Sequence, residues 1–254
     1  MKIVRFTQDS EPKYGLIEDN EVYAIEGDVF GDFERGERVG TLPEMRLLAP
    51  CEPTKIVAVG RNYAEHAAEM QSQVPTEPLV FLKPPSAVIG PGAAIVYPPI
   101  SQRVDYEAEL AVVIGRRARN VPANEALDFV LGYTCGNDVT ARDLQRKDGQ
   151  WTRSKSFDTF CPLGPWIVTG LDASDLPIES RVNGAVKQRS RTSQMIFPVA
   201  ELIRHITQVM TLEPGDVILT GTPAGIGPLQ PGDRVEVEIE GIGVLENTVV
   251  SGSV

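Results

Sequence analysis

The segment VDYEAELAVVIG (residues 104–115) alternates acidic and apolar side chains before it becomes wholly apolar. Alternate side chains of a β-strand share a face, so Asp105, Glu107 and Glu109 would point to one side of it. The other face would carry apolar side chains, namely Ala108, Leu110 and Val112. Neighbouring like charges are costly unless they face water or bind a cation. An exposed edge strand with a solvated acidic face is the alternative, but the apolar end favours a strand that enters a core.

Glycines and prolines cluster between the other short apolar segments of the chain, which is typical of strands joined by turns. Pro214-Gly215-Asp216 and Pro231-Gly232-Asp233 each precede a strand-like run. The regular strand–helix alternation of a doubly wound sheet is absent from the sequence. The pattern therefore predicts a β-rich α+β fold with few short helices.

The first fifty residues predict a small β unit of their own. Two apolar runs flank Glu18-Asp19-Asn20, a sequence that favours a hairpin turn. Residues 47–55 contain two prolines and resemble a linker. We therefore predict a small N-terminal β domain at 1–50 and a larger domain at 51–254.

Two segments predict helices. Residues 62–70 begin with Asn62, and Glu65 three positions later would complete a capping box. Residues 198–211 place their apolar side chains at helical spacing, with His205 near the edge of that stripe. We expect His205 to be structural.

Composition excludes several classes of function. The net charge is −11, and nucleic-acid binding requires a basic face. Three widely spaced cysteines and two histidines argue against a disulfide framework and a zinc site rich in imidazole. No apolar run approaches the length of a membrane span, so we expect a cytoplasmic protein without a nucleic-acid or membrane partner.

The segment GYTCGNDVTARDLQ (132–145) places Asp138 after a strand-like run, where it serves either as a metal ligand or in an Asx turn. Residues 142–155 then carry five basic and two acidic side chains. This local positive charge in an acidic chain predicts an anionic ligand. The polar composition and Gly149 indicate a mobile loop that closes over substrate, or simply a solvated loop.

His66 and Glu69 are three positions apart on the first predicted helix, so the carboxylate would orient the imidazole. An oriented histidine is a common general base, although a lone helical histidine is more often structural. The glycine-rich ILTGTPAGIG (218–227) lacks the spacing of nucleotide-binding loops. It predicts a tight turn that exposes a threonine hydroxyl to a small carboxylate.

Together these motifs resemble the fumarylacetoacetate hydrolase family, in particular its small bacterial acylpyruvase-like and 2-hydroxyhepta-2,4-diene-1,7-dioate isomerase-like members. The resemblance covers about residues 55–250 and includes, in the order of the family, GRNYAEH, FLKPPSAVIG, DYEAELAVVIG, GYTCGNDVTARDLQ, SKSFDTFCPLGP and ILTGTPAGIG. It implies a mixed β-sandwich roll, a catalytic role for the domain at 51–254, and a homodimer.

The resemblance also assigns roles to residues. The residues that it implies bind a divalent metal are Glu107, Glu109 and Asp138. His66 would be the base, supported by Glu69, while Gln145 and Lys155 would polarise the substrate. Arg142 and Thr222 would bind it. The larger family members carry a fourth acidic ligand where this chain has Val59, which argues against fumarylacetoacetate itself as the substrate.

These assignments predict a metal-dependent enzyme for small anionic 2-oxo acids, with Mg²⁺ or Mn²⁺ as cofactor and Ca²⁺ also compatible. Hydrolysis of a C–C bond in an acylpyruvate is the leading hypothesis. Two alternatives would use the same metal site. One is the decarboxylation of oxaloacetate, and the other is the isomerisation or decarboxylation of 2-hydroxyhepta-2,4-diene-1,7-dioate. A non-catalytic metal- or carboxylate-binding module is the alternative from another class, but such a module needs no base.

Overall fold

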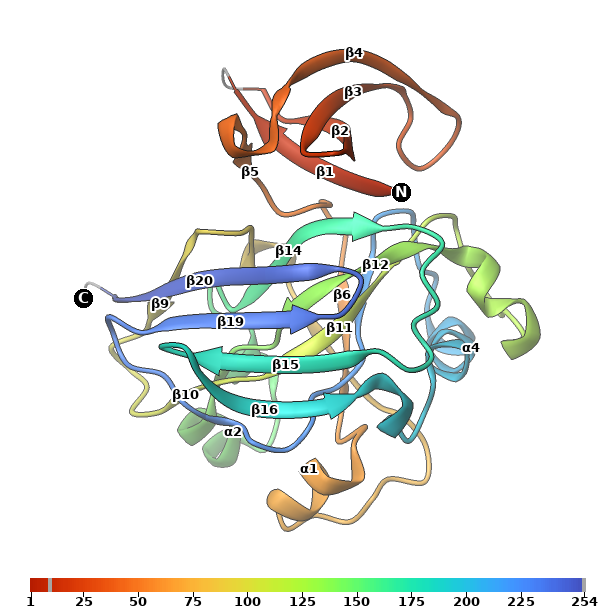
Figure 1. Cartoon of the computed structure of the whole chain (residues 1–254). Coiled ribbons are helices and arrows are strands. Elements are labelled where there is room, and N and C mark those ends of the chain that lie inside the picture. The colour runs from red at the N-terminus through yellow and green to blue at the C-terminus, as the bar shows by residue number, and fades with distance from the viewer. Residues whose placement is uncertain (9–10, 253–254) are drawn as a thin grey trace.

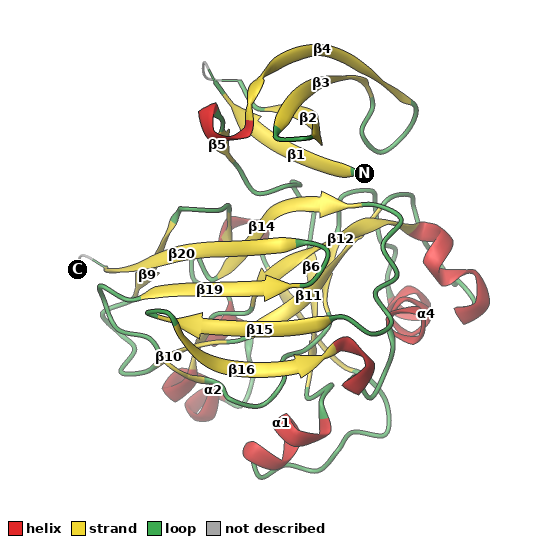
Figure 2. Ribbon diagram, viewed as in Figure 1, coloured by secondary structure: helices red, strands yellow, loops and turns green. Residues whose placement is uncertain are grey.

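The computed structural model describes residues 1–8 and 11–252 and is rich in strands that form mixed sheets (Figures 1 and 2). This confirms the predicted β-rich α+β class. The largest sheet has its path in the order β4 (Phe33–Thr41), β3 (Glu21–Gly27), β2 (Lys13–Glu18), β1 (Lys2–Thr7), β14 (Cys161–Val168), β12 (Val130–Asn137), β11 (Ala108–Ile114), β17 (Val217–Leu219), β6 (Ile56–Gly60) and β7 (Leu79–Lys83). Two short strands lie off this path, with β5 (Arg46–Leu47) beside β1 and β8 (Val88–Ile89) beside β14.

Two smaller sheets complete the β structure. One has the order β16 (Ala185–Arg191), β15 (Pro177–Val182), β19 (Arg234–Ile239), β20 (Gly243–Ser251) and β9 (Ala94–Tyr97). The other has the order β13 (Thr140–Ala141), β10 (Val104–Tyr106) and β18 (Gly227–Pro228). Both predicted Pro-Gly-Asp turns are present, since Gly215 and Gly232 have φ of 84° and 97° and precede β17 and β19.

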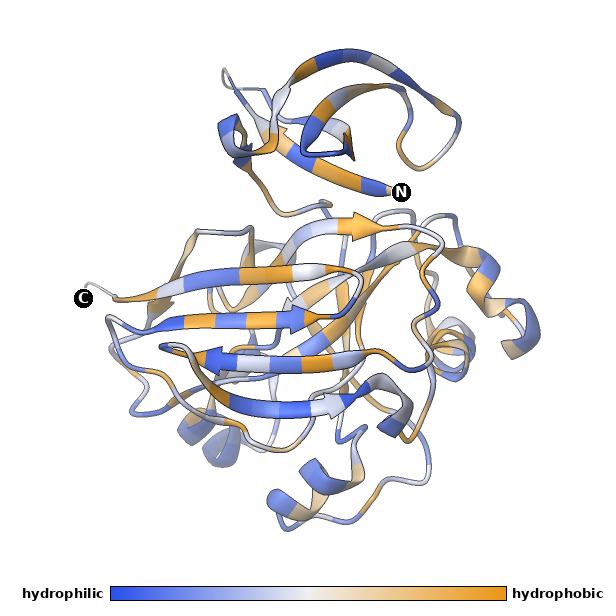
Figure 3. Cartoon of the chain, in the orientation of Figure 1, coloured by the Kyte–Doolittle hydropathy of each residue, from blue (hydrophilic) through white to orange (hydrophobic). Residues whose placement is uncertain are grey.

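The core lies where the five-stranded sheet covers β11 and β12. Along β19, Val235, Val237 and Ile239 are buried, and the glutamates between them alternate with this apolar face (Figure 3). Val237 and Ile239 belong to the same core cluster as Leu110 of β11. The strict alternation of RVEVEI thus places one face of β19 in the core.

The N-terminal β unit is joined to the large sheet. β1 pairs antiparallel with β14 through Lys2 and Ile3, so the sheet continues across the two parts of the chain. The predicted hairpin turn is confirmed, because Asp19 and Asn20 join β2 to β3 with φ of 48° and 69°. The boundary at residue 50 stays a prediction.

Helices are few and short among the described residues. The α-helices are α1 (Ala64–Glu69), α2 (Arg142–Asp148), α3 (Thr152–Lys155) and α4 (Val199–Val209). The 3₁₀ turns are η1 (Leu42–Glu44), η2 (Pro85–Ala87), η3 (Ala123–Phe129) and η4 (Thr192–Gln194). The second predicted helix corresponds to α4, and no helix in the described part of the chain is long and apolar enough to cross a membrane.

The prediction of a loop at 142–155 is wrong, because this segment forms α2 and α3. Gly149 adopts φ of 72° after α2, a conformation that glycine adopts without strain. Both helices bury polar side chains toward the interior, including Arg142, Gln145 and Lys155. The polar composition therefore has two origins, a buried polar site and exposed side chains such as Lys147 and Arg153.

Candidate active site

The backbone changes sheets at Glu107. The predicted strand is interrupted there, since β10 ends at Tyr106 and β11 begins at Ala108. The Glu107 N–H donates to Oδ1 of Asn137 at 2.9 Å, and its carbonyl accepts the N–H of Asp138 at 2.9 Å. These bonds replace a regular ladder and hold Glu107 against the end of β12.

Glu107, Glu109 and Asp138 form a buried carboxylate cluster. One carboxylate oxygen from each lies within 4.8 Å of the others, which is a separation that a metal ion can bridge. Asp105, which shares the alternation, is outside this cluster and pairs with Arg103 and Arg142. Oxygen-only ligands suit a hard divalent cation, so the donor set fits a metal of the magnesium or manganese type.

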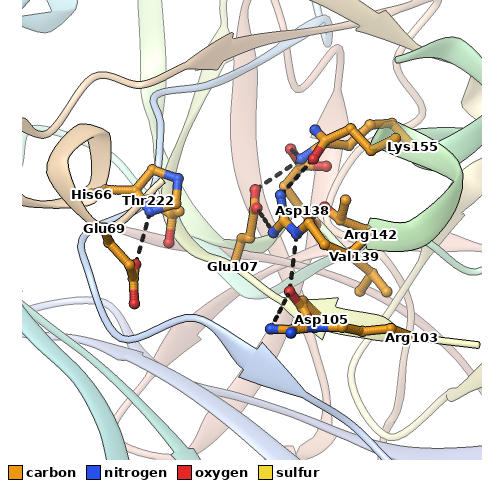
Figure 4. Close-up of polar contacts among 12 residues, drawn as sticks. His66, Glu69, Arg103, Asp105, Glu107, Asp138, Val139, Arg142, Lys155 and Thr222 are labelled. Atoms are coloured by element: carbon orange, nitrogen blue, oxygen red, sulfur yellow. Dashed lines mark hydrogen bonds and ion pairs between the residues drawn. The ribbon is translucent and has the colours of Figure 1, made fainter. Parts of the chain in front are cut away.

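Buried cations surround two of the three carboxylates (Figure 4). Lys155 Nζ donates to Glu107 Oε2 at 2.8 Å and to Asp138 Oδ2 at 2.5 Å. Lys83 Nζ donates to the other Asp138 oxygen at 2.5 Å, and Arg142 pairs with the second oxygen of Glu107. These side chains are almost fully buried, so each charge requires an oppositely charged neighbour to offset the cost of removing it from water.

Glu109 has a different environment. It accepts the backbone N–H of Gly221 at 2.6 Å and makes no ion pair among the described residues. Burial, together with the charges of Asp138 and Glu107, raises the pKa of Glu109 well above its ordinary value. Burial also acts to raise the pKa of Glu107, but Lys155 and Arg142 outweigh it and hold that pKa below its ordinary value. A bound cation would relieve the repulsion at Glu109.

His66 and Glu69 make the contact that their spacing predicts. Nδ1 of His66 lies 3.2 Å from Oε2 of Glu69, and His66 is buried in the pocket wall. The backbone N–H of Gly225 also donates to Glu69, at 3.1 Å to Oε1. In Figure 4 this pair and Lys155 lie on opposite sides of Glu107. Glu69 is thereby fixed as the partner that orients the imidazole.

Gln145 and Thr222 both line the same pocket. Gln145 Oε1 accepts from Arg142 at 2.7 Å, which leaves the amide NH₂ as the free end of the side chain. The expectation of an exposed threonine hydroxyl is wrong. Thr222 is 2% exposed, and its hydroxyl donates to the Ala108 carbonyl and accepts from Gln188 at 2.7 Å. The β11 edge and Gln188 supply partners that a local motif does not reveal.

The pocket unites all but one of the residues to which the sequence assigns a role, and has a volume of about 190 Å³. Glu69 does not line it but contacts His66, which does. Three relevant residues were missed by sequence reasoning, namely Lys83, Arg61 and Trp151. The signal in the sequence was a lysine at the end of the apolar run LVFLK. In the structure Lys83 is the one residue of β7 that is fully buried.

The capping box predicted for α1 is wrong. The N-cap residue is Tyr63, no side chain caps the helix, and Glu65 is exposed. The Asn62 side chain instead bonds the backbone of two distant segments. Its Nδ2 donates to the carbonyls of Phe197 and Thr220 at 3.0 and 2.8 Å, and its Oδ1 accepts the Phe197 N–H at 2.8 Å. Asn62 therefore fixes the start of α1 to the glycine-rich turn.

Asn62→Ala should lower the free energy of unfolding by about 2–3 kcal/mol, because it leaves buried backbone groups unpaired. Urea denaturation followed by circular dichroism measures this change. Glu65→Ala is the matched control and should leave stability unchanged. A loss with Glu65→Ala as large as that with Asn62→Ala would restore the capping box.

Comparison with known proteins identifies the family. Residues 55–250 match the family model described as fumarylacetoacetate (FAA) hydrolase C-terminal, and residues 1–50 match the model described as Rv2993c-like, N-terminal. The chain is 50% identical over 220 residues to the mitochondrial oxaloacetate tautomerase FAHD2A of Bos taurus, covering 82% of this chain and 70% of that protein.

Solved structures agree with this assignment. A 5-carboxymethyl-2-hydroxymuconate delta-isomerase from Mycobacterium smegmatis matches with a TM-score of 0.94 and 48% identity, over 99% of this chain and 100% of that one. Fumarylpyruvate hydrolase from Pseudomonas aeruginosa, in complex with Mn²⁺ and pyruvate, matches with a TM-score of 0.74 and 35% identity, over 78% and 90% of the chains. The chain therefore belongs to the fumarylacetoacetate hydrolase family, whose members include isomerases, tautomerases and hydrolases.

Proposed function

We propose that the protein is a divalent-metal-dependent enzyme that hydrolyses a C–C bond in a small acylpyruvate-type 2-oxo acid. One observation carries this proposal: the oriented imidazole of His66 and the three-carboxylate cluster line the same small pocket. A metal-binding module without activity would need no such base. The relative that binds Mn²⁺ together with pyruvate supports both a divalent cation and a 2-oxo acid.

Glu107, Glu109 and Asp138 would hold the cation, which when bound would act as a Lewis acid toward the oxygens of the 2-oxo acid. Mg²⁺ and Mn²⁺ both suit an all-oxygen site, and Ca²⁺ is compatible with it. Val59 also lines this pocket, so the position of the fourth acidic ligand in larger relatives is apolar here.

His66 is proposed to take the proton of the attacking water, and Glu69 to stabilise the imidazolium that forms. Lys155, whose pKa is raised because Asp138 and Glu107 outweigh its burial, stays protonated and can donate to a developing oxyanion. The amide NH₂ of Gln145, held in orientation by Arg142, is a second donor. The chain thus supplies a base and oxyanion donors within one pocket.

A second candidate uses proton transfer without hydrolysis. The tautomerase and isomerase relatives favour it, since both reactions move a proton on a 2-oxo acid or its enol. His66 and Glu69 are sufficient for that transfer, and oxaloacetate decarboxylation needs no base at all. Assays of the Mg²⁺-loaded protein with acetylpyruvate, fumarylpyruvate, oxaloacetate and 2-hydroxyhepta-2,4-diene-1,7-dioate distinguish these reactions. Cleavage of neither acylpyruvate would contradict the leading proposal.

Glu109→Gln should abolish measurable Mg²⁺ binding and leave the metal-free protein at least as stable as the wild type. Burial and the charges of Asp138 and Glu107 raise the pKa of Glu109 and so favour its neutral form in the absence of a metal, and glutamine keeps that neutral form. Isothermal titration with Mg²⁺ or Mn²⁺, and urea denaturation in chelator, measure the two effects. Glu213→Gln, in an exposed ion pair with Arg117, is the control. Undiminished Mg²⁺ binding by Glu109→Gln would contradict the metal site.

A further inference from the structure

Gln188 is the one buried residue of β16, an edge strand of the five-stranded sheet, and is 1% exposed. A bulge places it there. Next to the turn of this hairpin, Val186 lies opposite Arg181, a register that would bring Lys187 opposite Ser180. Lys187 is instead the extra residue of the bulge, and Gln188 lies opposite Ser180 on the inner face. The strand thus turns an uncharged amide, in place of a lysine, toward the interior.

The amide of Gln188 uses both of its ends. Its Oε1 accepts the N–H of Ala108 at 3.0 Å and the hydroxyl of Ser180 at 2.9 Å. Its Nε2 donates to the hydroxyl of Thr222 at 2.7 Å and to the carbonyl of Pro223 at 2.8 Å. The Thr222 hydroxyl in turn donates to the carbonyl of Ala108 at 2.8 Å. Gln188 and Thr222 together therefore hold both backbone polar groups of Ala108.

Ala108 is the residue between two carboxylates of the buried cluster, Glu107 and Glu109. Bonds to its N–H and carbonyl fix the two peptide planes from which these side chains extend. The Gly221 N–H, next to Thr222 in the glycine-rich turn, also donates to Glu109 at 2.6 Å. Gln188 thus joins the backbone of the cluster to the turn that bonds one of its carboxylates.

The same bulge packs against the end of the glycine-rich turn. A Cβ on Gly225, whose φ is 101°, would clash with the carbonyl oxygen of Lys187, so a glycine is required there. The Gly225 N–H donates to Glu69, the residue that contacts His66. β16 therefore lies behind both the carboxylate cluster and the partner of the proposed base.

We propose that Gln188 is a positioning residue, which sets the separation of Glu107 and Glu109 and thereby the affinity of the site for a divalent cation. Gln188 does not line the pocket, so it acts through Ala108 and Thr222. The inference rests on the proposed function, because it takes the carboxylate cluster to be a metal site. Side chains that orient metal ligands typically contribute 10- to 100-fold to metal affinity, as an order of magnitude.

Gln188→Met keeps the length of the side chain and removes all four hydrogen bonds. It should weaken Mg²⁺ binding by about 10- to 100-fold, as measured by isothermal titration. Electron paramagnetic resonance, which measures the free Mn²⁺ in solution, should show the same loss of affinity for Mn²⁺.

The matched control is Asn247→Leu. Asn247 is 2% exposed on β20 of the same sheet, and its amide donates to the carbonyls of Gly90 and Ala93 at 2.9 and 2.8 Å. None of these three residues lines the pocket. Urea denaturation in chelator should show that both variants lose stability, because each loses bonds of a buried amide. Asn247→Leu should nevertheless bind Mg²⁺ like the wild type.

Two variants of Thr222 test the same contacts without changing Gln188, and they decide the question if Gln188→Met does not fold. Thr222→Val removes the hydroxyl between Gln188 and Ala108 and should weaken Mg²⁺ binding by about 10-fold. Thr222→Ser keeps the hydroxyl and should bind Mg²⁺ like the wild type. The loss in Gln188→Met/Thr222→Val should be smaller than the product of the two single losses, because both changes break the same bond.

The outcomes separate this inference from the proposed function. Wild-type Mg²⁺ affinity in Gln188→Met, or in Thr222→Val where the first variant does not fold, would overturn the inference and leave the proposed function intact. Equal losses of Mg²⁺ affinity in Gln188→Met and Asn247→Leu would reflect a general loosening of the sheet and also overturn it. Failure of the wild type to bind either Mg²⁺ or Mn²⁺ would overturn the proposed function and this inference together.

Discussion

His66→Ala is expected to lower kcat for acylpyruvate cleavage by about 10²–10⁴-fold, the usual contribution of a general base. The buried imidazole, oriented by Glu69 at 3.2 Å, is the histidine in the pocket wall. Oxaloacetate decarboxylation has no water to activate, so the same variant should retain much of that activity. Steady-state kinetics on both substrates measures the difference.

Three further measurements make the result interpretable. Glu69→Gln should also lower kcat for acylpyruvate cleavage, but by a smaller factor than His66→Ala, because Glu69 acts through His66. The matched control is His205→Ala. His205 is a half-buried residue of α4, and this variant should have wild-type activity. Mg²⁺ affinity must be unchanged in all three variants. Intact cleavage by His66→Ala would return His66 to a packing role and favour a reaction without a base.

Lys83→Met should destabilise the metal-free protein by about 3 kcal/mol. Lys83 is 1% exposed and donates to Asp138 at 2.5 Å, so its removal leaves one oxygen of a buried carboxylate without its partner. Urea denaturation in chelator measures the loss. The double variant Lys83→Met/Asp138→Asn should recover part of the lost stability, because the unpaired carboxylate charge is then removed as well.

An exposed pair supplies the control for Lys83. Arg153→Met breaks the ion pair with Asp148 at the surface and should change stability too little to measure. Equal stability of Lys83→Met and the wild type would show that Asp138 is already neutral or satisfied by Lys155 alone. Lys83 would then contribute nothing measurable to the ion pairs around Asp138.

The features that the sequence predicts correctly are those set by local periodicity. Alternation in 104–115 places Leu110 and Val112 in the core, opposite Glu109. The i, i+3 spacing alone predicts the contact of His66 with Glu69. Turn chemistry likewise predicts the hairpin at Asp19-Asn20. Each of these depends on residues within a few positions of one another.

The features that sequence reasoning misses depend on partners far along the chain. Lys83 and Asp138 are 55 positions apart, and Asn62 and Thr220 are 158 apart. A count of local charge finds Arg142 and Lys155 but cannot show that buried carboxylates neutralise them. The same count cannot distinguish Arg146, which lines the pocket and makes no ion pair among the described residues. Spatial pairing decides which of several basic residues is available to a ligand.

The position of β17 has a consequence for how the enzyme is made. β17 lies between β11 and β6 in the large sheet, and it is parallel to β6, with Val217 opposite Ile56. Lys55 and Asp216 beside this pairing are 161 positions apart. Closing so large a loop costs entropy before any contact rewards it, which slows folding. During synthesis, the strand that precedes His66 and the strand that carries Glu109 therefore cannot be joined in the sheet until β17 has left the ribosome.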